Sequence, residues 1–548
     1  MSRAAASPAG RVPQTALVLI TVLALAVGIW ARFSNVTHKI YYQDEAITSI
    51  RTAGFLLADV NAVFDGKPHT FADLQRLERP GPDRDVRATI ASLALEDPQH
   101  PPLYYVAQAL WMRAVGWEPA QMRVLPVLLS LVALPLGYWC ALELFGSRTS
   151  ALVFTALLAV SPFQVLYSYQ TREYGLLTVA ILAASWALLR ALRLRDSPRA
   201  WLAYALAVAL GLYTYLLFAY VVIAHALYVA LLERSPTLRL RRFVIACGSG
   251  VALAGPWLAI VVARRQTISG DLDWAQTAYP LMFMASKWAF FASATFCDLA
   301  YANVRFAPVA LAVVTFALYA LIRASRDATP RIALFIVATT ATAAVLLVGQ
   351  DLALHERFST IARYLAPTWL GLQLAVAYVI GTALDEARSA RTSRLWTAAC
   401  ALIVLAGAGA DAINSRAPSW WENSGNRPLP AMAVVLAAKP HAIVVVQNEY
   451  APMLSLAFLV EGTLRLQGTL GGRTPRVDVA AGDPVYLFTP SDALRAHLAM
   501  LQHLRFRSVY DSHDSKLAVS QFRGAVASAK YGRGNAWGDG SLWKLQRP

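Results

Sequence analysis

Long apolar runs separated by short polar segments occupy the first three quarters of the chain. A bilayer core is about 30 Å thick and is crossed by a helix of about 20 apolar residues. Eleven runs reach or approach this length, and they predict a mainly α-helical bundle with about eleven membrane spans. The runs are 14–33, 123–145, 149–168, 173–193, 201–216, 218–233, 243–263, 306–323, 332–350, 363–382 and 396–411. The first is not followed by a small-residue cleavage site, so we expect an uncleaved anchor rather than a signal peptide.

Two further apolar segments, 101–116 and 281–297, are shorter than a full span. If either were counted as a span, the short loops rich in Arg would no longer all fall on the same side of the membrane. We therefore expect both to re-enter the membrane or to lie in its outer interface. The alternative is that each is a short span and that one of the other runs is not a span.

The pattern changes after residue 411. Short strand-like runs at 442–446 and 485–489 alternate with helix-like stretches at 451–459 and 491–502. This alternation predicts a small α/β domain. No GxGxxG nucleotide fingerprint occurs in it, and we expect a lid or an acceptor-docking role rather than chemistry.

Two domains are therefore expected. The first is a membrane domain over residues 1–411, whose outer loop at 34–122 carries interfacial helices. The second is an outer α/β domain over residues 412–548.

Composition narrows the class of protein. Apolar residues make up 57% of the chain and charged residues 15%, whereas soluble domains carry about 25% charged residues. A soluble enzyme is therefore disfavoured, and a disordered chain is excluded. The 49 Lys and Arg exceed the 33 Asp and Glu by 16, a surplus typical of nucleic-acid-binding proteins. So apolar a chain offers little solvated basic surface, and we expect an integral membrane protein that binds no nucleic acid.

Basic residues gather in five short segments, and in proteins with several spans such segments mark the cytoplasmic side. They contain Arg3, Arg11, Arg190, Arg193, Arg195, Arg199, Arg234, Arg239, Arg241, Arg242, Arg323, Arg326, Arg331, Arg388, Arg391 and Arg394. Even numbers of predicted spans separate all five segments. The N-terminus is then expected inside and the tail after residue 411 outside. Arg264 and Arg265 fall on the outer side and run against this scheme.

Two adjacent carboxylates, Asp44 and Glu45, follow the first span. Carboxylates at a membrane surface are costly unless they are solvated or functional. Neighbouring residues cannot face the same way on a helix, so one can face a cavity while the other pairs or caps. The apolar spacing that follows predicts a helix in the membrane interface over 45–60. The alternative is that Asp44 only caps this helix.

His100 and three arginines are further polar groups on the predicted outer side. His100 precedes two prolines, which fix an extended entry into a helix. Histidine can bind phosphate or relay a proton; otherwise His100 is a polar turn residue. Arg172, Arg357 and Arg363 break the charge rule for outer loops, and a lipid phosphate gripped by guanidinium groups explains them. The alternative partner of Arg172 is Glu173. Together these residues indicate a lipid-phosphate site facing a carboxylate base.

Several motifs support a family resemblance by their order. They are Asp44-Glu45, His100-Pro101-Pro102-Leu103-Tyr104-Tyr105, Leu144-Phe145-Gly146-Ser147-Arg148, Ser161-Pro162-Phe163, Tyr167–Tyr174, and Arg363-Tyr364 with Pro367. Over roughly residues 14–411 the chain resembles the GT-C glycosyltransferases. Within them it is most similar to the protein O-mannosyltransferase and lipid A aminoarabinose transferase group (glycosyltransferase families 39 and 83). Thr171 departs from the pattern, because relatives often carry an acidic residue before the Arg. His100 stands where the aminoarabinose transferases have Lys.

The resemblance implies a GT-C fold and a polyprenyl-phosphate sugar donor, in a bacterium undecaprenyl phosphate. It also implies catalysis on the periplasmic face of the inner membrane, with Asp44 as the catalytic base and Glu45 as the second residue of the pair. The candidates for binding the donor phosphate are His100, Arg172, Arg363 and Tyr364. Further candidates for substrate binding are Tyr42, Tyr104, Tyr105, Tyr169, Glu173 and Arg357.

The chemistry of these residue types fits sugar transfer. A carboxylate can take the proton of an acceptor hydroxyl during attack, and Arg can stabilise the polyprenyl phosphate that leaves. One base and one displacement predict inversion, since a double displacement requires a second, opposed carboxylate. A divalent metal would be able to bridge carboxylates and phosphate, but no ligand cluster is readable, so no metal is assigned. The sugar stays open, and the acceptor can be lipid A, another envelope glycan or a protein.

Two other classes of protein stay open on the residues alone. A lipid or glycan transporter or flippase often has inverted repeats and broken spans. No convincing internal repeat is found, and most charges lie at span ends. The third class is a receptor or scaffold without catalytic activity.

Overall fold

The computed structural model describes residues 14–194, 197–477, 483–512 and 540–546. The chain forms two compact units. The first unit contains the residues up to Val36, residues 97–104 and residues 123–415. The second unit contains residues 37–96, residues 105–122 and the residues from Arg416 onward.

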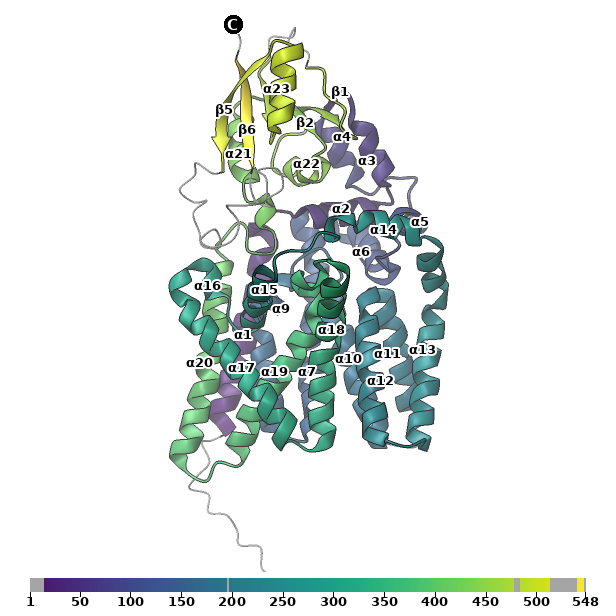
Figure 1. Cartoon of the computed structure of the whole chain (residues 1–548), viewed down its shortest axis with the longest axis vertical. Coiled ribbons are helices and arrows are strands. Elements are labelled where there is room, and N and C mark those ends of the chain that lie inside the picture. The colour runs from purple at the N-terminus through teal and green to yellow at the C-terminus, as the bar shows by residue number, and fades with distance from the viewer. Residues whose placement is uncertain (1–13, 195–196, 478–482, 513–539, 547–548) are drawn as a thin grey trace, which may run out of the picture. The chain divides into compact units, whose positions relative to one another are not determined.

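Nine helices within the described ranges are long and apolar enough to cross a membrane. They are α1 (Gln14–His38), α7 (Pro119–Phe145), α10 (Tyr174–Leu194), α12 (Ala219–Glu233), α13 (Leu238–Ala263), α17 (Ala307–Asp327), α18 (Pro330–Leu354), α19 (Ala366–Asp385) and α20 (Ala390–Asn414) (Figure 1). Helix α12 reaches the required length together with the single turn Leu216–Phe218 that precedes it.

Nine to ten of the about eleven expected spans have the length of a full span in the described part of the chain. The run at 149–168 forms two helices, α8 (Arg148–Ala159) and α9 (Pro162–Ser168), which meet at an angle of 55°. Proline cannot continue the preceding helix, and Ser161 caps the new one by accepting the Gln164 N–H. Counted as one span, the bent pair brings the total in the described part of the chain to ten.

The run at 201–233 is divided at Tyr215, near the place where the sequence suggested a division. Helix α11 (Pro198–Thr214) ends there because Tyr215 has extended backbone, with φ −159° and ψ 130°. At 17 residues, α11 is shorter than the about 20 residues that a full span needs.

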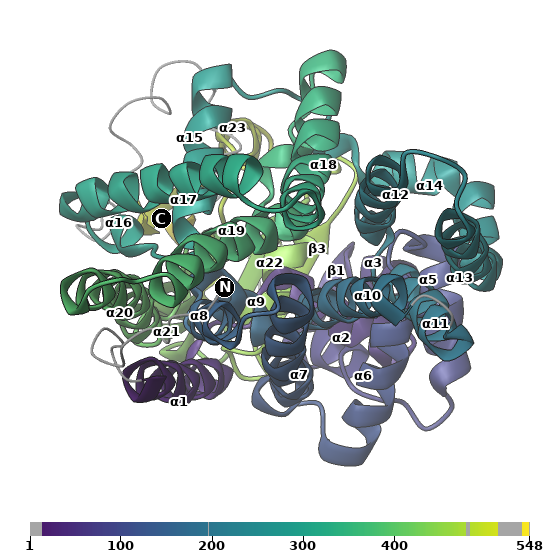
Figure 2. The ribbon, with the colours of Figure 1, turned by 90° about the horizontal axis from the view of Figure 1, so that it is seen from below.

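Helix α19 lies at the centre of the first unit. Figure 2 shows it among α8, α17, α18 and α20, and it packs on all four. Glycines permit this close packing, as is common between membrane helices. A Cβ atom at Gly371 would lie 2.2 Å from the Thr340 hydroxyl, and one at Gly381 would lie 2.1 Å from the Ser150 hydroxyl.

Four of the short helices in the described residues connect or flank the spans. Helices α6 (Pro102–Val115) and α15 (Leu281–Ala294) correspond to the two weak apolar segments, and each has 14 residues. At 1.5 Å per residue each is about 21 Å long, which is less than the about 30 Å of a bilayer core. The other two are α14 (Arg265–Asp271) and α16 (Leu299–Ala302).

A six-stranded mixed sheet forms the core of the second unit, with the strand order β1-β3-β2-β4-β6-β5. The strands are β1 (Asp65–Thr70), β2 (Ile443–Gln447), β3 (Arg465–Thr469), β4 (Val485–Phe488), β5 (Arg505–Asp511) and β6 (Ser541–Gln546). Strand β2 runs parallel to β3 and β4, and the other pairs are antiparallel. In β1, His69 pairs with Leu466, so a strand from the loop after α1 completes one edge of the sheet.

Among the described residues, the second unit contains most of α6 and seven further helices. The seven are α2 (Gln43–Ala53), α3 (Leu57–Val63), α4 (Phe71–Leu77), α5 (Val86–Glu96), α21 (Leu429–Ala437), α22 (Tyr450–Ala457) and α23 (Asp492–Leu501). Alternate residues of a strand face opposite sides of a sheet, and both sides are buried here. Val444 and Val446 face the core shared with α2, α4, α21 and α22, whereas Ile443 and Val445 face the core shared with α23.

The predicted fold class is confirmed: a mainly helical membrane protein with a C-terminal α/β domain. The two predicted tail strands correspond to β2 and β4, and the two predicted tail helices to α22 and α23. The predicted interfacial helix at 45–60 is α2 followed by the start of α3.

Candidate active site

The first turn of α2 carries Asp44 and Glu45. Tyr42 precedes the helix with extended backbone, φ −75° and ψ 151°. The Glu45 carboxylate accepts the Tyr42 N–H at 2.9 Å from N to Oε2, and it is fully buried. Glu45 therefore caps the helix through its side chain. Asp44 is partly exposed at the positive end of the helix dipole, which stabilises a carboxylate.

Buried contacts fix α2 along its length. The Tyr41 and Ser49 hydroxyls are hydrogen-bonded at 2.7 Å, and Ile50 is buried in the core of the unit. Arg51 donates to the Glu96 carboxylate at 2.5 Å. These contacts hold the first turn of the helix, and with it Asp44, in one orientation.

His100 lies against the turn that precedes α10. The His100 ring is hydrogen-bonded through Nδ1 to the Glu173 carboxylate at 3.0 Å, and the Arg172 guanidinium lies 3.2 Å from Nε2. Asp97 lies 3.7 Å from Nε2. Glu173, the alternative partner considered for Arg172, lies 3.5 Å from the Arg172 Nε.

Glu173 is fully buried, yet it is held ionised. Burial alone raises the pKa of its carboxyl, but the charges of Arg172 and His100 and the hydrogen bond from His100 outweigh burial and lower the pKa to about 2. A permanent negative charge at Glu173 therefore orients His100 and Arg172.

The Tyr174 ring is the common neighbour of two cations. The Arg172 guanidinium carbon lies 5.6 Å and the Arg363 guanidinium carbon 5.2 Å from its centroid. Arg363 also lies 5.5 Å from the ring of Tyr364. Arginine stacks well on aromatic faces while its N–H groups stay directed at other partners. The predicted phosphate-binding residues His100, Arg172, Arg363 and Tyr364 thus lie in one cluster around Tyr174.

These residues all come directly before helix starts. His100 precedes α6, Arg172 precedes α10, and Arg363 lies in the single turn Ala362–Leu365 that leads into α19. Helix N-termini attract anions through their unpaired N–H groups and their dipole. The cluster has the charges and the helix ends that suit a phosphate group.

Arg357 lies in a different aromatic group. It donates to the Trp274 carbonyl, and its guanidinium carbon lies 4.8 Å from the Tyr279 ring centroid. Phe358 contacts both Trp274 and Tyr364, with centroids 6.0 Å and 6.4 Å apart. One ring therefore separates Arg357 from the Tyr174 cluster.

The four predicted substrate-binding tyrosines are all buried. Tyr104 and Tyr105 are fully buried on α6. The Tyr169 ring lies 5.8 Å from the guanidinium carbon of Arg123, which is itself fully buried. Tyr42 provides the N-cap backbone of α2. Packing accounts for these positions, and roles in substrate binding stay predictions.

Three residues of the Tyr174 cluster were not selected from the sequence. Tyr174 lies at the end of a motif that was recognised, and Asp97 lies three residues before His100. Tyr215 contacts the rings of Tyr174 and Tyr364, with centroids 6.1 Å and 6.3 Å apart. In the sequence, Tyr215 is marked only by the break in the apolar run. Its ring contacts cannot be predicted, because Tyr174 and Tyr364 lie far away along the chain.

A metal site was left unassigned from the sequence. No group of three or more His, Cys, Asp or Glu side chains is placed to hold a metal ion in the ranges that the structure describes.

Comparison with known proteins adds independent information. Residues 99–260 match the sequence model of the family described as dolichyl-phosphate-mannose-protein mannosyltransferase. A sequence search of curated proteins gives no match.

Two solved structures are similar to this chain. One is ArnT from Cupriavidus metallidurans bound to undecaprenyl phosphate, with 13% identity over 97% of this chain and 98% of that chain and a TM-score of 0.49. The other is the archaeal oligosaccharyltransferase AglB from Archaeoglobus fulgidus in complex with an inhibitory peptide and a dolichol-phosphate. It shows 10% identity over 83% of this chain and 64% of that chain, with a TM-score of 0.46.

The family match spans the motifs at 100–105, 144–148 and 161–174, and the predicted resemblance is confirmed. The chain is a membrane glycosyltransferase. Its residues 99–260 are similar to the protein mannosyltransferases, a family whose description names a dolichyl-phosphate-mannose donor. The enzyme interpretation therefore replaces the transporter and scaffold alternatives.

Proposed function

We propose that the protein transfers a sugar with inversion from a polyprenyl phosphate to a hydroxyl of an envelope acceptor, with Asp44 as the base. The observation that carries this proposal is the gathering of His100, Arg172, Arg363 and Tyr364 around Tyr174. Residues from three distant parts of the sequence supply cations and helix ends to one place. Their common property is affinity for phosphate oxygens.

In this mechanism the Tyr174 cluster binds the donor phosphate. As the bond between the anomeric carbon and the phosphate oxygen breaks, negative charge grows on the phosphate. Arg172 and Arg363 stabilise that charge, so the leaving group needs no proton. Glu173 stays ionised and holds His100 and Arg172 in place.

Asp44 takes the proton of the acceptor hydroxyl while that oxygen attacks the anomeric carbon. The carboxylate of Glu45 is already hydrogen-bonded to the Tyr42 N–H. We therefore assign Glu45 to positioning Asp44 rather than to proton transfer, which refines the pairing implied by the resemblance.

The proposed setting is the inner membrane of a bacterium, with undecaprenyl phosphate as the lipid carrier. The arrangement of basic loops supports a cytoplasmic N-terminus. It follows that the reaction takes place on the periplasmic face, where an envelope glycan, lipid A or a protein supplies the hydroxyl.

Membrane vesicles supplied with a radiolabelled polyprenyl-phosphate sugar test this proposal. We expect Asp44→Asn to lower transfer by about 10²–10⁴-fold, the usual contribution of a general base. Asp83→Asn, at an exposed position of the same unit, serves as the matched control and should leave transfer unchanged. Normal transfer by Asp44→Asn would overturn the assignment of the base.

The same vesicles test the phosphate site. Arg363→Lys keeps the charge but loses the planar fork, so we expect donor kcat/KM to fall by about 10- to 100-fold, as for loss of a charged hydrogen bond. Arg264→Lys, at an exposed arginine outside the cluster, is the control. Equal effects of the two substitutions would remove Arg363 from the donor site.

A further inference from the structure

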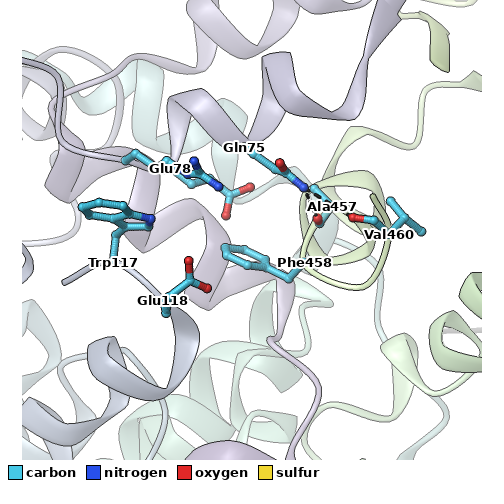
Figure 3. A pocket seen from close by; sticks show the side chains of 8 residues that line it. Gln75, Glu78, Trp117, Glu118, Ala457, Phe458 and Val460 are labelled. Atoms are coloured by element: carbon cyan, nitrogen blue, oxygen red, sulfur yellow. Dashed lines mark hydrogen bonds between the residues drawn. The ribbon is translucent and has the colours of Figure 1, made fainter. Parts of the chain in front are cut away.

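A cavity of about 100 Å³ lies within the second unit. Its wall is formed by residues at the end of α4, by Trp117 and Glu118, and by the segment after α22 (Figure 3). One water needs about 10–15 Å³ by this measure, so the cavity can hold several waters or one small ring. The amide of Gln75 ties two sides of it together by donating to the carbonyls of Ala457 and Val460 at 2.7 Å and 3.5 Å.

Glu78 is the unusual residue of this cavity. Its side chain is 98% buried, and neither carboxyl oxygen has a hydrogen-bond partner among the residues that the structure describes. Buried polar groups almost always have a partner, and leaving one unmet costs free energy. Burial raises the pKa of Glu78 well above its usual range, and the nearby charge of Arg79 opposes this only in part. A protonated Glu78 both donates and accepts hydrogen bonds.

Aromatic rings complete the cavity. Figure 3 shows the rings of Trp117 and Phe458 and the carboxyl groups of Glu78 and Glu118 turned toward the same space. Trp117 is 39% exposed, so part of its ring is accessible to a ligand. Apolar and aromatic walls with a few convergent polar groups are typical of ligand sites.

The residues favour an uncharged ligand. The guanidinium of Arg79 lies 5.8 Å from the Trp117 ring centroid, so a positive charge already lies beside this ring and repels a cationic ligand. A sugar ring matches the remaining groups, because its C–H face packs on an aromatic ring and its hydroxyls both donate and accept hydrogen bonds.

The cavity also adjoins the segment that leads to the proposed base. Phe458 lines the cavity, and its ring meets the Tyr41 ring edge-on with centroids 4.7 Å apart. Tyr41 lies three residues before Asp44.

We propose that this cavity binds one sugar ring of a glycan acceptor, with Glu78 hydrogen-bonded to its hydroxyls and Trp117 stacked on its face. The acceptor is accordingly a saccharide rather than a protein side chain alone. The inference that a sugar binds depends only on the residues of the cavity. The inference that this sugar belongs to the acceptor rests on the proposed function.

Saturation-transfer NMR on the full-length protein in detergent tests the cavity. The probes are the methyl glycosides of glucose, mannose, galactose and N-acetylglucosamine, without donor. We expect millimolar binding of at least one glycoside, weakened by about tenfold or more in Trp117→Ala and Glu78→Leu, the size typical of an energetically dominant contact. Glu78→Gln keeps both a donor and an acceptor and should bind within about threefold of the native protein.

Trp543→Ala is the matched control, because Trp543 lies in the same unit under a stacked Arg495 but does not line the cavity. It should bind the glycoside like the native protein, and thermal unfolding confirms that each variant is folded. Absence of saturation transfer to every glycoside overturns the proposal, as does equal binding by Trp117→Ala. Competition by methylammonium together with loss of binding in Glu78→Gln also overturns it, in favour of a cation site.

Transfer measured on the same proteins separates the two proposals. Asp44→Asn should still bind the glycoside while it loses transfer, and Trp117→Ala should raise the KM for a glycan acceptor with kcat unchanged. A native protein that transfers sugar without binding glycosides contradicts the cavity and leaves the proposed function intact. A native protein that binds glycosides but transfers no sugar contradicts the proposed function and, with it, the acceptor role of the cavity.

Discussion

At the scale of single residues, the informative side chains are the polar groups that disobey the general pattern of the chain. Arg172 and Arg363 stand out in the sequence because the topology predicted from the basic loops places them on the side where basic residues are rare. Their pairing with Tyr174 and with Glu173 is visible only in the structure. Glu78 shows the opposite case, since nothing in its sequence neighbourhood distinguishes it from an exposed loop residue.

The low pKa of Glu173 makes the stability of the first unit depend on pH. The folded-state pKa of Glu173 is about 2, and the ordinary value is 4.5. The ionised carboxylate therefore contributes fully to the free energy of unfolding above pH 4.5, and this contribution is lost as the pH falls toward 2. The pKa difference of about 2.5 units corresponds to about 3 kcal/mol in the free energy of unfolding. We expect Glu173→Gln to lower the unfolding temperature at pH 7 and the gap from the native protein to close in acid. Thermal unfolding in detergent from pH 7 to pH 3 measures this, and a gap that does not change with pH would contradict it.

At the scale of elements, each helix boundary near the proposed site has a local cause that can be read from the sequence. Pro162 starts α9, the two prolines after His100 start α6, and Pro367 lies at the start of α19. The sequence does not predict the bend of 55° between α8 and α9. Both halves of the run are uniformly apolar, so the pattern does not indicate the direction of the second helix. The sequence also leaves open which residue caps α2, because both Asp44 and Glu45 suit a helix N-terminus.

Two substitutions at Glu45 separate capping from catalysis. Glu45→Ala removes the acceptor for the Tyr42 N–H, and we expect a loss of about 1 kcal/mol in stability, as for other helix caps, with slower transfer. Glu45→Gln keeps an acceptor oxygen and should change both quantities little. Thermal unfolding and the vesicle assay give the two readouts. If Glu45→Gln were stable but as inactive as Asp44→Asn, Glu45 would take part in proton transfer.

At the scale of the whole molecule, contacts group residues that the sequence separates. Residues 37–96 share a compact unit with the residues from Arg416 onward. Strand β1 pairs with β3 although about 400 residues lie between them. Phe64, Phe71 and Leu74 of the loop after α1 belong to the same core as Val444 and Leu454 of the tail. Local periodicity predicts strands and helices, but it cannot predict which distant edge a strand will join.

This grouping predicts that the tail does not fold by itself. A fragment of residues 416–548 leaves the β3 edge unpaired and exposes apolar core residues, and unpaired sheet edges promote aggregation. We expect it to be aggregated or to bind a hydrophobic dye, whereas residues 37–96 joined to it through a flexible linker should give a more stable monomer. Size-exclusion chromatography and circular dichroism compare the two fragments. A monomeric tail that melts cooperatively would contradict the shared core.

The sequence by itself determined the membrane class, the helical spans, the strands and helices of the tail and the residues suited to phosphate. These properties follow from periodicity, composition and local charge, which neighbouring residues already carry. The tertiary structure alone decided that Tyr174 and Tyr215 join the arginines, that β1 completes the tail sheet and that Glu78 is buried beside Trp117. Such contacts join residues far apart in the chain, and they form only when whole elements pack to bury their apolar faces.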